Sequence, residues 1–253
     1  MSKKPFAIDL FCGLGGWTEG LLAEGYEVVG FDVERHCYGD HVYPAQLVLQ
    51  DVLTLHGSQF KDAALIVASP PCQEFSYMAM PWAKAKAKRK AILADPDERK
   101  RLTALFNACF RIQAEACEAA GHHIPMVVEN VRGAQEWVGR SRWNFGSFHL
   151  WGDVPALMPM SGRPAKVGGL DWSAYGKPGY KAKGFNVTAV QRLREGTKQG
   201  GDWFNSSQPS LSRMTSSRSP ARKAASAMIA KIPLTLSRHI ATVYKPQELE
   251  AAR

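Results

Sequence analysis

The sequence predicts an α/β protein with a doubly wound, mainly parallel sheet and a small irregular lobe. Strand and helix patterns alternate from the N-terminus to residue 131, and polar residues follow each apolar run where a parallel strand would end. The chain has 253 residues, which is enough for one large domain with an added lobe. Its content of 45% apolar and 22% charged residues is ordinary for a globular protein.

The elements of the first half follow from short apolar runs bounded by glycine or proline and from helical spacing of apolar residues. Gly25 and Gly121 are placed to end the helices that precede them. In order, we expect a strand at 6–11, a helix at 17–24, a strand at 26–31, a short helix and a strand leading to 50, a strand at 63–68, a helix at 97–120 and a strand at 125–131.

The pattern changes after Gly133. Residues 133–215 are rich in Gly, Trp, Ser and basic residues, with short β-like runs such as 145–151, and they predict irregular structure. Helices are expected again at 221–231, after Ser219 and Pro220, and at 234–243, after Pro233. We therefore expect residues 1–150 and 216–253 to form the main domain and residues 151–215 to form the lobe.

The positive charge is unevenly distributed. The net charge is +9, and segment 84–101 holds eight of the Lys and Arg residues. Segment 163–198 holds eight more, and segment 213–231 holds five without an acid. Such clusters favour a polyanionic partner, with nucleic acid first, and a merely solvated basic surface is the alternative.

Other classes of protein are disfavoured. No apolar run approaches the roughly 18 residues of a membrane span, and the N-terminus lacks the apolar core of a signal peptide. We therefore expect a cytoplasmic protein with no membrane partner. The five cysteines include no Cys-x-x-Cys pair, and the seven histidines show no ligand-like spacing. This pattern predicts neither a disulfide framework nor a metal site.

The first candidate site follows the first predicted strand. Gly13, Gly15 and Gly16 would let a ligand approach the backbone at the amino end of a helix. Asp32, at the tip of the next strand, suits hydrogen bonds to ribose hydroxyls. Together they predict a nucleoside cofactor rather than only a tight turn, and the spacing is not that of an NAD fingerprint. Asp51 would bind an adenine amino group or cap a helix.

The second candidate site is the tetrad Pro70-Pro71-Cys72-Gln73, directly after the buried run 63–68. A thiol on a turn stiffened by two prolines and followed by a basic segment is a candidate nucleophile. A buried structural cysteine is the alternative. Glu129, at the end of another predicted strand, is a candidate proton donor beside the thiol, or a strand-end cap.

Three motifs together resemble the cytosine-C5 DNA methyltransferases. They are Asp9-Leu-Phe-Cys-Gly-Leu-Gly-Gly16, Ser69-Pro-Pro-Cys-Gln-Glu-Phe-Ser76 and Val128-Glu-Asn-Val131. The resemblance covers residues 6–133 and implies a Rossmann-like fold, S-adenosylmethionine as the cofactor and double-stranded DNA as the partner. It also implies a monomer in a bacterial or phage-infected cell. The small size and divergent second half look phage- or prophage-like, and the family's restriction-modification role is part of the implication.

The resemblance also implies roles for individual residues. Cys72 would attack C6 of a flipped cytosine while Glu129 acts at N3, so that C5 accepts the methyl group. The implied cofactor residues are Asp9, Phe11, Gly13, Gly15, Gly16, Asp32, Asp51 and Pro70. The implied substrate or DNA contacts are Gln73, Ser76, Asn130, Arg132, Arg140, Arg142, Lys84, Lys86 and Arg213.

The chain departs from the family's pattern at several points. Glu74 stands where the family usually has glycine, and Met78–Lys90 would be either a loop that clamps DNA or a solvated basic helix. The family's Gln-x-Arg-x-Arg element is absent, and Arg140 with Arg142 would replace it. The final Gly-Asn-Ser-Val-like element is also absent. Aromatic residues of the lobe would stack on bases or form its small core; they are Trp172, Tyr175, Tyr180 and Trp203.

Three functional hypotheses follow. The first is methyl transfer to C5 of cytosine in DNA. The second keeps the fold and the thiol but acts on RNA cytosine or transfers a different group. The third is a non-catalytic DNA-binding relative, which the combination of Cys72 and Glu129 disfavours, because a binding module needs neither.

Overall fold

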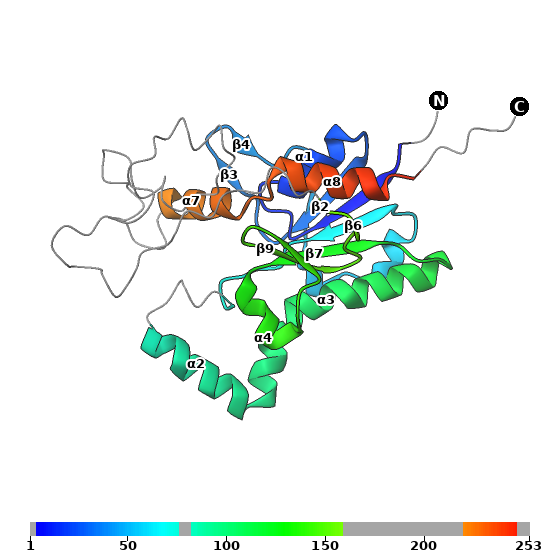
Figure 1. Ribbon diagram of the computed structural model, residues 1–253. Coiled ribbons are helices and arrows are strands. Elements are labelled where there is room, and N and C mark those ends of the chain that lie inside the picture. Colours follow the sequence, from blue (N-terminus) through cyan, green and yellow to red (C-terminus); the bar gives the residue numbers. More distant parts are fainter. Residues whose placement is uncertain (1–3, 76–81, 159–219, 247–253) are drawn as a thin grey trace, which may run out of the picture. The chain divides into compact units, whose positions relative to one another are not determined.

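The computed structural model describes residues 4–75, 82–158 and 220–246 (Figure 1). Internal contacts divide the chain into two compact units, one of residues 1–158 with 232–253 and the other of residues 159–231. Helix α7 (Pro220–Ala230) belongs to the second unit. The assignment of a recognition lobe to 151–215 stays a prediction, since most of that segment lies outside the described residues.

The first unit is built on a seven-stranded sheet in the order β5-β2-β1-β6-β7-β9-β8. The five strands from β5 to β7 run parallel, while β9 and β8 are antiparallel additions at one edge. This mostly parallel mixed sheet confirms the predicted α/β class. The strands are β1 Phe6–Leu10, β2 Glu27–Asp32, β5 Gln46–Leu49, β6 Leu65–Ala68, β7 Met126–Asn130, β8 Trp143–Phe145 and β9 Phe148–Gly152.

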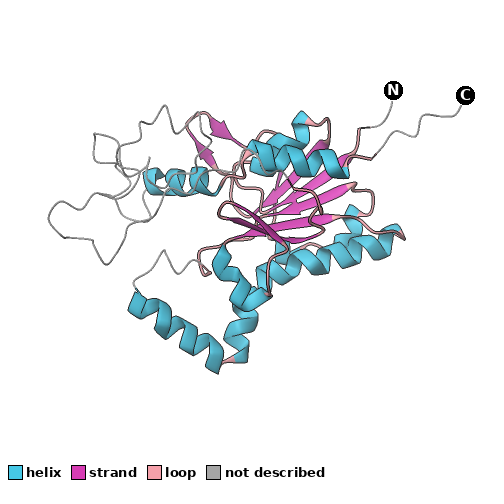
Figure 2. Ribbon diagram, in the orientation of Figure 1, coloured by secondary structure: helices cyan, strands magenta, loops and turns pink. Residues whose placement is uncertain are grey.

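Helices cover both faces of this sheet (Figures 1 and 2). Helix α3 (Pro96–Ala120) lies on one face, while α1 (Gly16–Ala23) and α8 (Leu234–Tyr244) lie together on the other. A Cβ atom on Gly20 of α1 would collide with Ser237 and Arg238 of α8, so this glycine allows the two helices to approach closely. The predicted helix 97–120 is confirmed, with Asp95 capping its start and Gly121 ending it at φ 72°.

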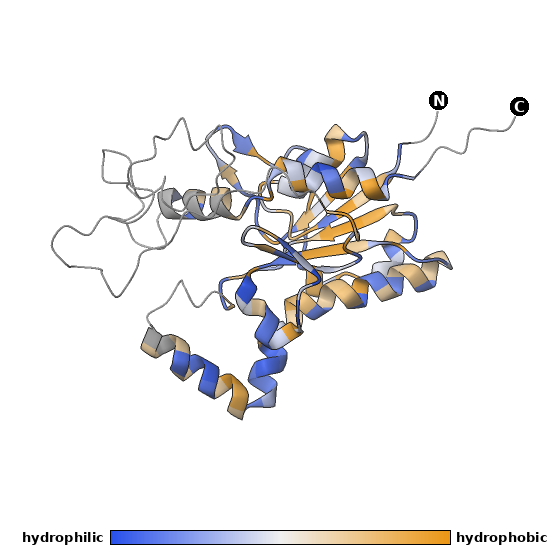
Figure 3. Cartoon of the chain, in the orientation of Figure 1, coloured by the Kyte–Doolittle hydropathy of each residue, from blue (hydrophilic) through white to orange (hydrophobic). Residues whose placement is uncertain are grey.

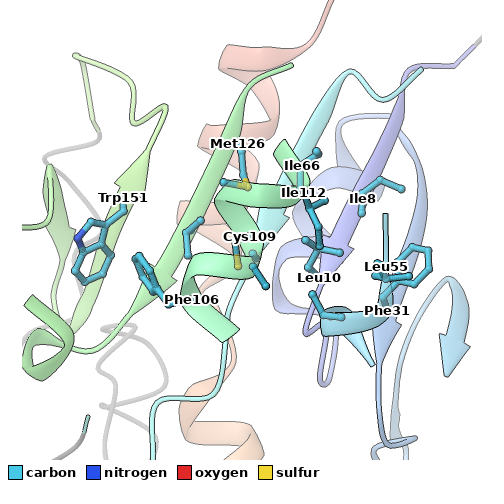
Figure 4. Packing of buried hydrophobic residues seen from close by; sticks show 14 of the residues in the cluster. Ile8, Leu10, Phe31, Leu55, Ile66, Phe106, Cys109, Ile112, Met126 and Trp151 are labelled. Carbon is cyan, nitrogen blue, oxygen red and sulfur yellow. The ribbon is translucent and has the colours of Figure 1, made fainter. Parts of the chain in front are cut away.

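Each face has its own apolar core. On the α3 face, Phe106, Cys109 and Ile112 pack against Ile66 and Met126 of the central strands (Figure 4). On the other face, Trp17 and Leu21 of α1 pack with Leu236 and Ile240 of α8. Figure 3 shows the apolar character of the central strands and the polar character of much of α2 (Trp82–Ala94). The sheet is therefore buried on both faces, which leaves the ends of its strands for chemistry.

Shorter elements complete the first unit. They are the 3₁₀ turns η1 Val52–Thr54, η2 Gly57–Phe60 and η4 Arg132–Ala134, and the one-turn helix α4 Gln135–Val138. No helix in the described segments combines the length and the apolar character that a membrane span requires.

The structure corrects two expectations and decides a third point that the sequence left open. The short helix expected between Asp32 and Gln50 is instead a hairpin of β3 (Cys37–Tyr38) and β4 (His41–Val42). Its turn is Gly39-Asp40, with Gly39 at φ 61°, a sequence that favours tight hairpins. Of the two alternatives left open for Met78–Lys90, residues 82–90 form a helix, since they belong to α2, whose alternating Ala and Lys residues have high helix propensity.

The second correction concerns the stretch after Gly133. The β-like run expected at 145–151 is confirmed, but it does not belong to irregular structure: residues 143–145 and 148–152 form β8 and β9, which extend the main sheet beside β7. Gly146 closes their turn at φ 61°. The runs are too short to show the alternation of a strand, and only pairing with β7 decides their place in the main sheet.

Candidate active site

The carboxyl ends of the five parallel strands meet at one edge of the sheet. The chain winds in opposite directions from β1 and β6, so the crevice between these neighbouring strands is the expected position of a ligand. The glycine loop follows β1, and Asp32 ends β2. The proline turn follows β6, and Asn130 ends β7. The fold thus brings the two sites predicted from sequence to the same edge.

The three glycines of the loop have different surroundings. Gly13 has φ 51° and nothing within 4 Å of the place a Cβ atom would take, so a ligand can approach its backbone there. Gly15 caps α1 at φ 75° and lies against Tyr43 and Pro44. A Cβ atom on Gly16 would collide with the backbone of Ile232. Of the three, Gly13 is therefore suited to a ligand, and Gly16 serves the packing of the chain.

Asp32 is a buried carboxylate with fixed orientation. Its Oδ2 accepts from the backbone N–H of Gly13 at 3.0 Å, and its Oδ1 accepts from that of Glu34 at 3.2 Å. Burial by itself raises the pKa of Asp32, but hydrogen bonds from His36, Gly13 and Glu34 outweigh it and hold the pKa below its ordinary value. An ionised carboxylate with lone pairs remaining is suited to accept hydrogen bonds from ribose hydroxyls.

Asp9 lies beneath the glycine loop rather than on the surface of the site. It is 1% exposed, and its Oδ2 accepts from the Thr18 hydroxyl at 2.7 Å, which also contacts the Tyr43 hydroxyl. Its Oδ1 has no hydrogen-bond partner among the described residues. Burial, and in addition the charge of Asp32, raises the pKa of Asp9 to about 8. The structure therefore gives Asp9 a supporting place under the loop.

Phe11 connects β1 to the loop with an unusual backbone. It is the one non-glycine residue of the described segments at positive φ, at 57°. Such a conformation costs on the order of 1 kcal/mol and persists only where the surroundings impose it. Phe11 packs against the apolar core of the α3 face, which fixes the start of the loop.

Two apolar residues beside the acids were not predicted from sequence. Val33 follows Asp32 and is 70% exposed, and Leu53, close after Asp51, is 48% exposed. The Gln50 N–H donates to the Asp32 carbonyl at 2.9 Å, so these segments leave the sheet side by side. Exposed apolar side chains beyond the ends of β2 and β5 are suited to pack against the flat faces of a nucleoside base. In the sequence, such a residue appears only as an apolar residue next to an acid at the end of a strand. A buried core residue at the same place looks identical, so the sequence does not distinguish the two.

Asp51 itself caps η1. Its Oδ1 accepts from the Leu53 N–H at 2.9 Å, and the side chain is exposed. This is the capping role left open by the sequence, and it leaves the second carboxylate oxygen available to a ligand.

Cys72 lies half-buried in a turn that is tied to its neighbours. The Phe75 N–H donates to the Cys72 carbonyl at 3.0 Å and closes the turn. The Asn130 side chain donates from Nδ2 to the Pro70 carbonyl at 2.9 Å within the protein interior. On the other side, the Trp17 indole donates to the Ser69 hydroxyl at 2.9 Å. These bonds hold the turn between the glycine helix and the end of β7.

Glu129 is positioned by the sheet. In the parallel pairing of β6 with β7, Ala68 lies opposite Val128, so Ser69 and Glu129 occupy the next positions. Glu129 is 9% exposed, and its neighbour Asn130 makes the bond to Pro70. A carboxyl group and a thiol-bearing turn thus share one end of adjacent strands. Trp17 and Ser69, which help to create this arrangement, were not singled out from sequence because single polar residues carry no motif.

The two arginines expected to replace the missing element lie in an anchored segment. Ser141, between them, interacts with Gln135 Oε1 through its N–H and its hydroxyl, at 3.2 and 3.1 Å. The Ser141 hydroxyl also contacts His149 Nδ1 at 2.9 Å. Arg140 and Arg142 are exposed, as is Arg132 in η4. A fixed backbone with exposed guanidinium groups is suited to contact phosphate or a base.

Part of the basic cluster is occupied by internal ion pairs. Lys88 of α2 and Arg101 of α3 both face Glu74, at 3.5 and 3.7 Å, and Arg89 pairs with Glu136 of α4 at 2.5 Å. Lys86 and Gln73 are exposed. Ser76, Arg213 and the side chain of Lys84 lie outside the described residues. Among the described residues, no group of three or more His, Cys, Asp or Glu side chains is placed to hold a metal ion.

Comparison with known proteins supports a family assignment. Residues 6–95 match the family described as C-5 cytosine-specific DNA methylase. No curated protein sequence matches the chain. Similar solved structures include a candidate DNA modification methyltransferase encoded within an E. coli prophage, at 22% identity and a TM-score of 0.36 over 54% of this chain and 35% of that one.

Other similar structures are the Dnmt2 methyltransferase of S. pombe and the methyltransferase EhMeth of Entamoeba histolytica. The first has 17% identity and a TM-score of 0.34 over 54% of this chain and 37% of that one. The second has 15% identity and a TM-score of 0.34 over 55% of this chain and 41% of that one. The matched part thus spans well under half the length of each of these proteins. Residues 6–95, which match the C-5 cytosine-specific DNA methylase family, contain both the glycine loop and the Pro-Pro-Cys-Gln turn.

Proposed function

We propose that this protein transfers a methyl group from S-adenosylmethionine to C5 of cytosine in DNA. The observation that carries the proposal is the buried hydrogen bond from Asn130 to the Pro70 carbonyl. This bond joins the turn that carries Cys72 to the end of the strand that carries Glu129. A nucleophile and an acid are the two groups needed for addition of a thiol to a pyrimidine. A purely structural cysteine would not need this arrangement.

The residues on the β1–β2–β5 side fit the cofactor. Open space at Gly13 admits a ligand to the backbone, and the oriented Asp32 carboxylate accepts from ribose hydroxyls. Val33 and Leu53 offer exposed apolar surface to the adenine, with Asp51 at its amino group. When bound, S-adenosylmethionine supplies a methyl group made electrophilic by its sulfonium. Asp9 and Gly16 would support this site from below, and Phe11, Gly15 and Pro70 would shape it.

The residues on the β6–β7 side support the reaction. With the cytosine flipped out of its helix, the Cys72 thiolate forms a bond to C6 while Glu129 donates a hydrogen bond or proton at N3. This makes C5 nucleophilic, and C5 gains the methyl group. Loss of the C5 proton then restores the C5–C6 double bond and expels the Cys72 thiolate. Arg132, Arg140 and Arg142 would hold the nucleotide, and the segment 151–215 would read the sequence around it.

A mechanism-based trap tests this proposal. The protein is incubated with labelled S-adenosylmethionine and a DNA duplex that contains 5-fluorocytosine, whose fluorine cannot leave as the C5 proton does. A covalent protein–DNA adduct that carries the label is expected, and Cys72→Ala should abolish it. Cys37→Ala is the matched control, because Cys37 is exposed and lies in the β3–β4 hairpin, away from the proline turn.

An RNA hairpin of the same sequence forms the second arm of this experiment. An adduct on RNA alone would assign the enzyme to RNA cytosine. Glu129→Gln should retain cofactor binding and lose the adduct. If cofactor binds but no adduct forms on either nucleic acid, the protein is not a C5 methyltransferase.

A further inference from the structure

The turn after Cys72 carries an acidic residue in an unusual setting. Glu74 is the only acid between Asp62 and Asp95, and the next charged residues along the chain are the five bases of segment 84–90. It follows the nucleophile by two positions and stands at the point where the chain departs from the family's glycine. An acid so close to a site for a polyanion opposes the binding of that partner unless its charge is neutralised.

The structure shows how the charge of Glu74 is balanced. Its Oε2 lies 3.5 Å from Lys88 Nζ of α2 and 3.7 Å from Arg101 Nη2 of α3. Both distances exceed those of good N–H···O hydrogen bonds, which are about 2.7–3.2 Å. The side chains of Glu74 and Arg101 are 46% and 58% exposed. Ion pairs of this kind contribute little to stability, and another anion can replace the carboxylate at small cost.

There is room for the side chains to rearrange. A cavity of about 180 Å³ borders both Glu74 and Arg101, and its lining is completed by apolar residues of the turn and of α3: Pro71, Phe75, Leu102 and Leu105. Arg101 has a second acceptor in Glu98, whose Oε2 lies 2.9 Å from Nη2. The guanidinium therefore has an anchor when its contact with Glu74 is lost.

We infer that Lys88 and Arg101 are a binding site for the phosphodiester backbone of the nucleic acid next to the target nucleotide, and that Glu74 holds this site in the free protein. The inference rests on the proposed function, since the nucleotide held at Cys72 brings its own phosphates to the turn that carries Glu74. On binding, a phosphate takes the place of the carboxylate between the two cations. The nucleic acid is the better partner, because it presents a row of phosphates whose condensed counterions are released when Lys and Arg bind them.

The test is the affinity of Glu74→Gln for a fluorescent DNA duplex and for an RNA hairpin of the same sequence, measured by anisotropy. Removal of the competing carboxylate should tighten binding by about three- to tenfold at about 50 mM salt, and by much less at about 200 mM, where screening weakens the competition. Glu118→Gln, an equal change of charge at an exposed position near the far end of α3, is the matched control and should have little effect.

A double-mutant cycle separates this site from a general charge effect. In the Lys88→Gln/Arg101→Gln background, binding should be weaker, and Glu74→Gln should no longer tighten it beyond the Glu118→Gln control. Equal effects of Glu74→Gln and Glu118→Gln would overturn the inference, as would weaker binding by Glu74→Gln. Thermal melting of each variant checks that the fold is intact.

The outcomes also separate this inference from the proposed function. If the 5-fluorocytosine adduct forms but Glu74→Gln binds like the control, the phosphate site alone is wrong. If Glu74→Gln tightens binding but no adduct forms, the phosphate site stands and the proposed chemistry is wrong. If no variant binds either nucleic acid, both are wrong.

Discussion

The two halves of the active-site edge are held together by different forces. On the β1–β2–β5 side, the glycine loop is fixed by backbone hydrogen bonds and by buried side chains such as Asp9, Thr18 and Asp32. On the β6–β7 side, the buried bond from Asn130 and the bond from Trp17 to Ser69 hold the Cys72 turn, and Glu74 within this turn makes exposed ion pairs. Buried contacts resist change, whereas exposed ion pairs exchange with salt and ligands. The proposed cofactor side is thus a rigid cradle, and the proposed target side is a surface that can rearrange around a polyanion.

The rigidity of the cradle is tested most strongly at its glycines. Gly16→Ala places a methyl group against the backbone of Ile232 and should lower the free energy of unfolding by about 3 kcal/mol. Gly13→Ala meets open space, so it should cost only the strain of positive φ, about 1–2 kcal/mol. It should nevertheless weaken S-adenosylmethionine binding roughly tenfold, since the methyl group fills the ligand's path.

Chemical denaturation and calorimetric titration of both glycine variants measure these effects. If Gly16→Ala is as stable as the wild type, Gly16 is not required for packing against Ile232. If Gly13→Ala binds the cofactor normally, the space beside Gly13 is not the ligand's path.

The buried Asp9 makes the cradle sensitive to pH. Its pKa is raised from the ordinary 3.8 to about 8, so the folded protein holds a proton that the unfolded chain releases. Asp9 therefore contributes stability that is fully present below pH about 4 and is lost as the pH rises to about 8. Between pH 5 and 8 the loss should be on the order of 3 kcal/mol, because one proton contributes at most about 1.4 kcal/mol per pH unit and the slope falls as the pH approaches 8.

Asp9→Asn should remove this dependence, because the amide stays neutral at every pH. Thermal melts of the wild type and Asp9→Asn across this pH range measure the difference. Parallel curves for the two proteins would show that Asp9 does not hold the proton.

The buried bond from Asn130 to Pro70 is tested by Asn130→Ala. This change removes the donor to the buried Pro70 carbonyl. The free energy of unfolding should fall by about 1–2 kcal/mol. The turn of Cys72 would lose its tie to the strand of Glu129, so the rate of adduct formation should fall while cofactor affinity stays the same. Asn107→Ala, on the exposed face of α3, is the matched control. An unchanged adduct rate in Asn130→Ala would mean that the bond does not position the nucleophile.

Local sequence was sufficient for the parallel strands and the long helix. The apolar run before Pro70 predicts a strand, because a strand buried on both faces is apolar throughout. The helical spacing before Gly121 predicts a helix, because a helix buried on one face repeats its apolar residues every three to four positions. The same logic placed Cys72 and Glu129 at strand ends. It failed for the hairpin at Gly39, where the turn signal is short, and for the place of β8 and β9 in the main sheet, since pairing with β7 is a long-range contact.

The sequence by itself determined the fold class, the succession of the parallel strands along the chain, and the motifs by which residues 6–95 match a known family. Only the tertiary structure decided how neighbours in the motifs divide their roles. Gly13 faces open space while Gly16 packs on Ile232, Asp9 is buried while Asp32 is held for a ligand, and Glu74 faces cations from two helices. The physical reason is that periodicity and turn chemistry are local properties, whereas burial, pKa and ion pairing depend on residues that only the fold brings together.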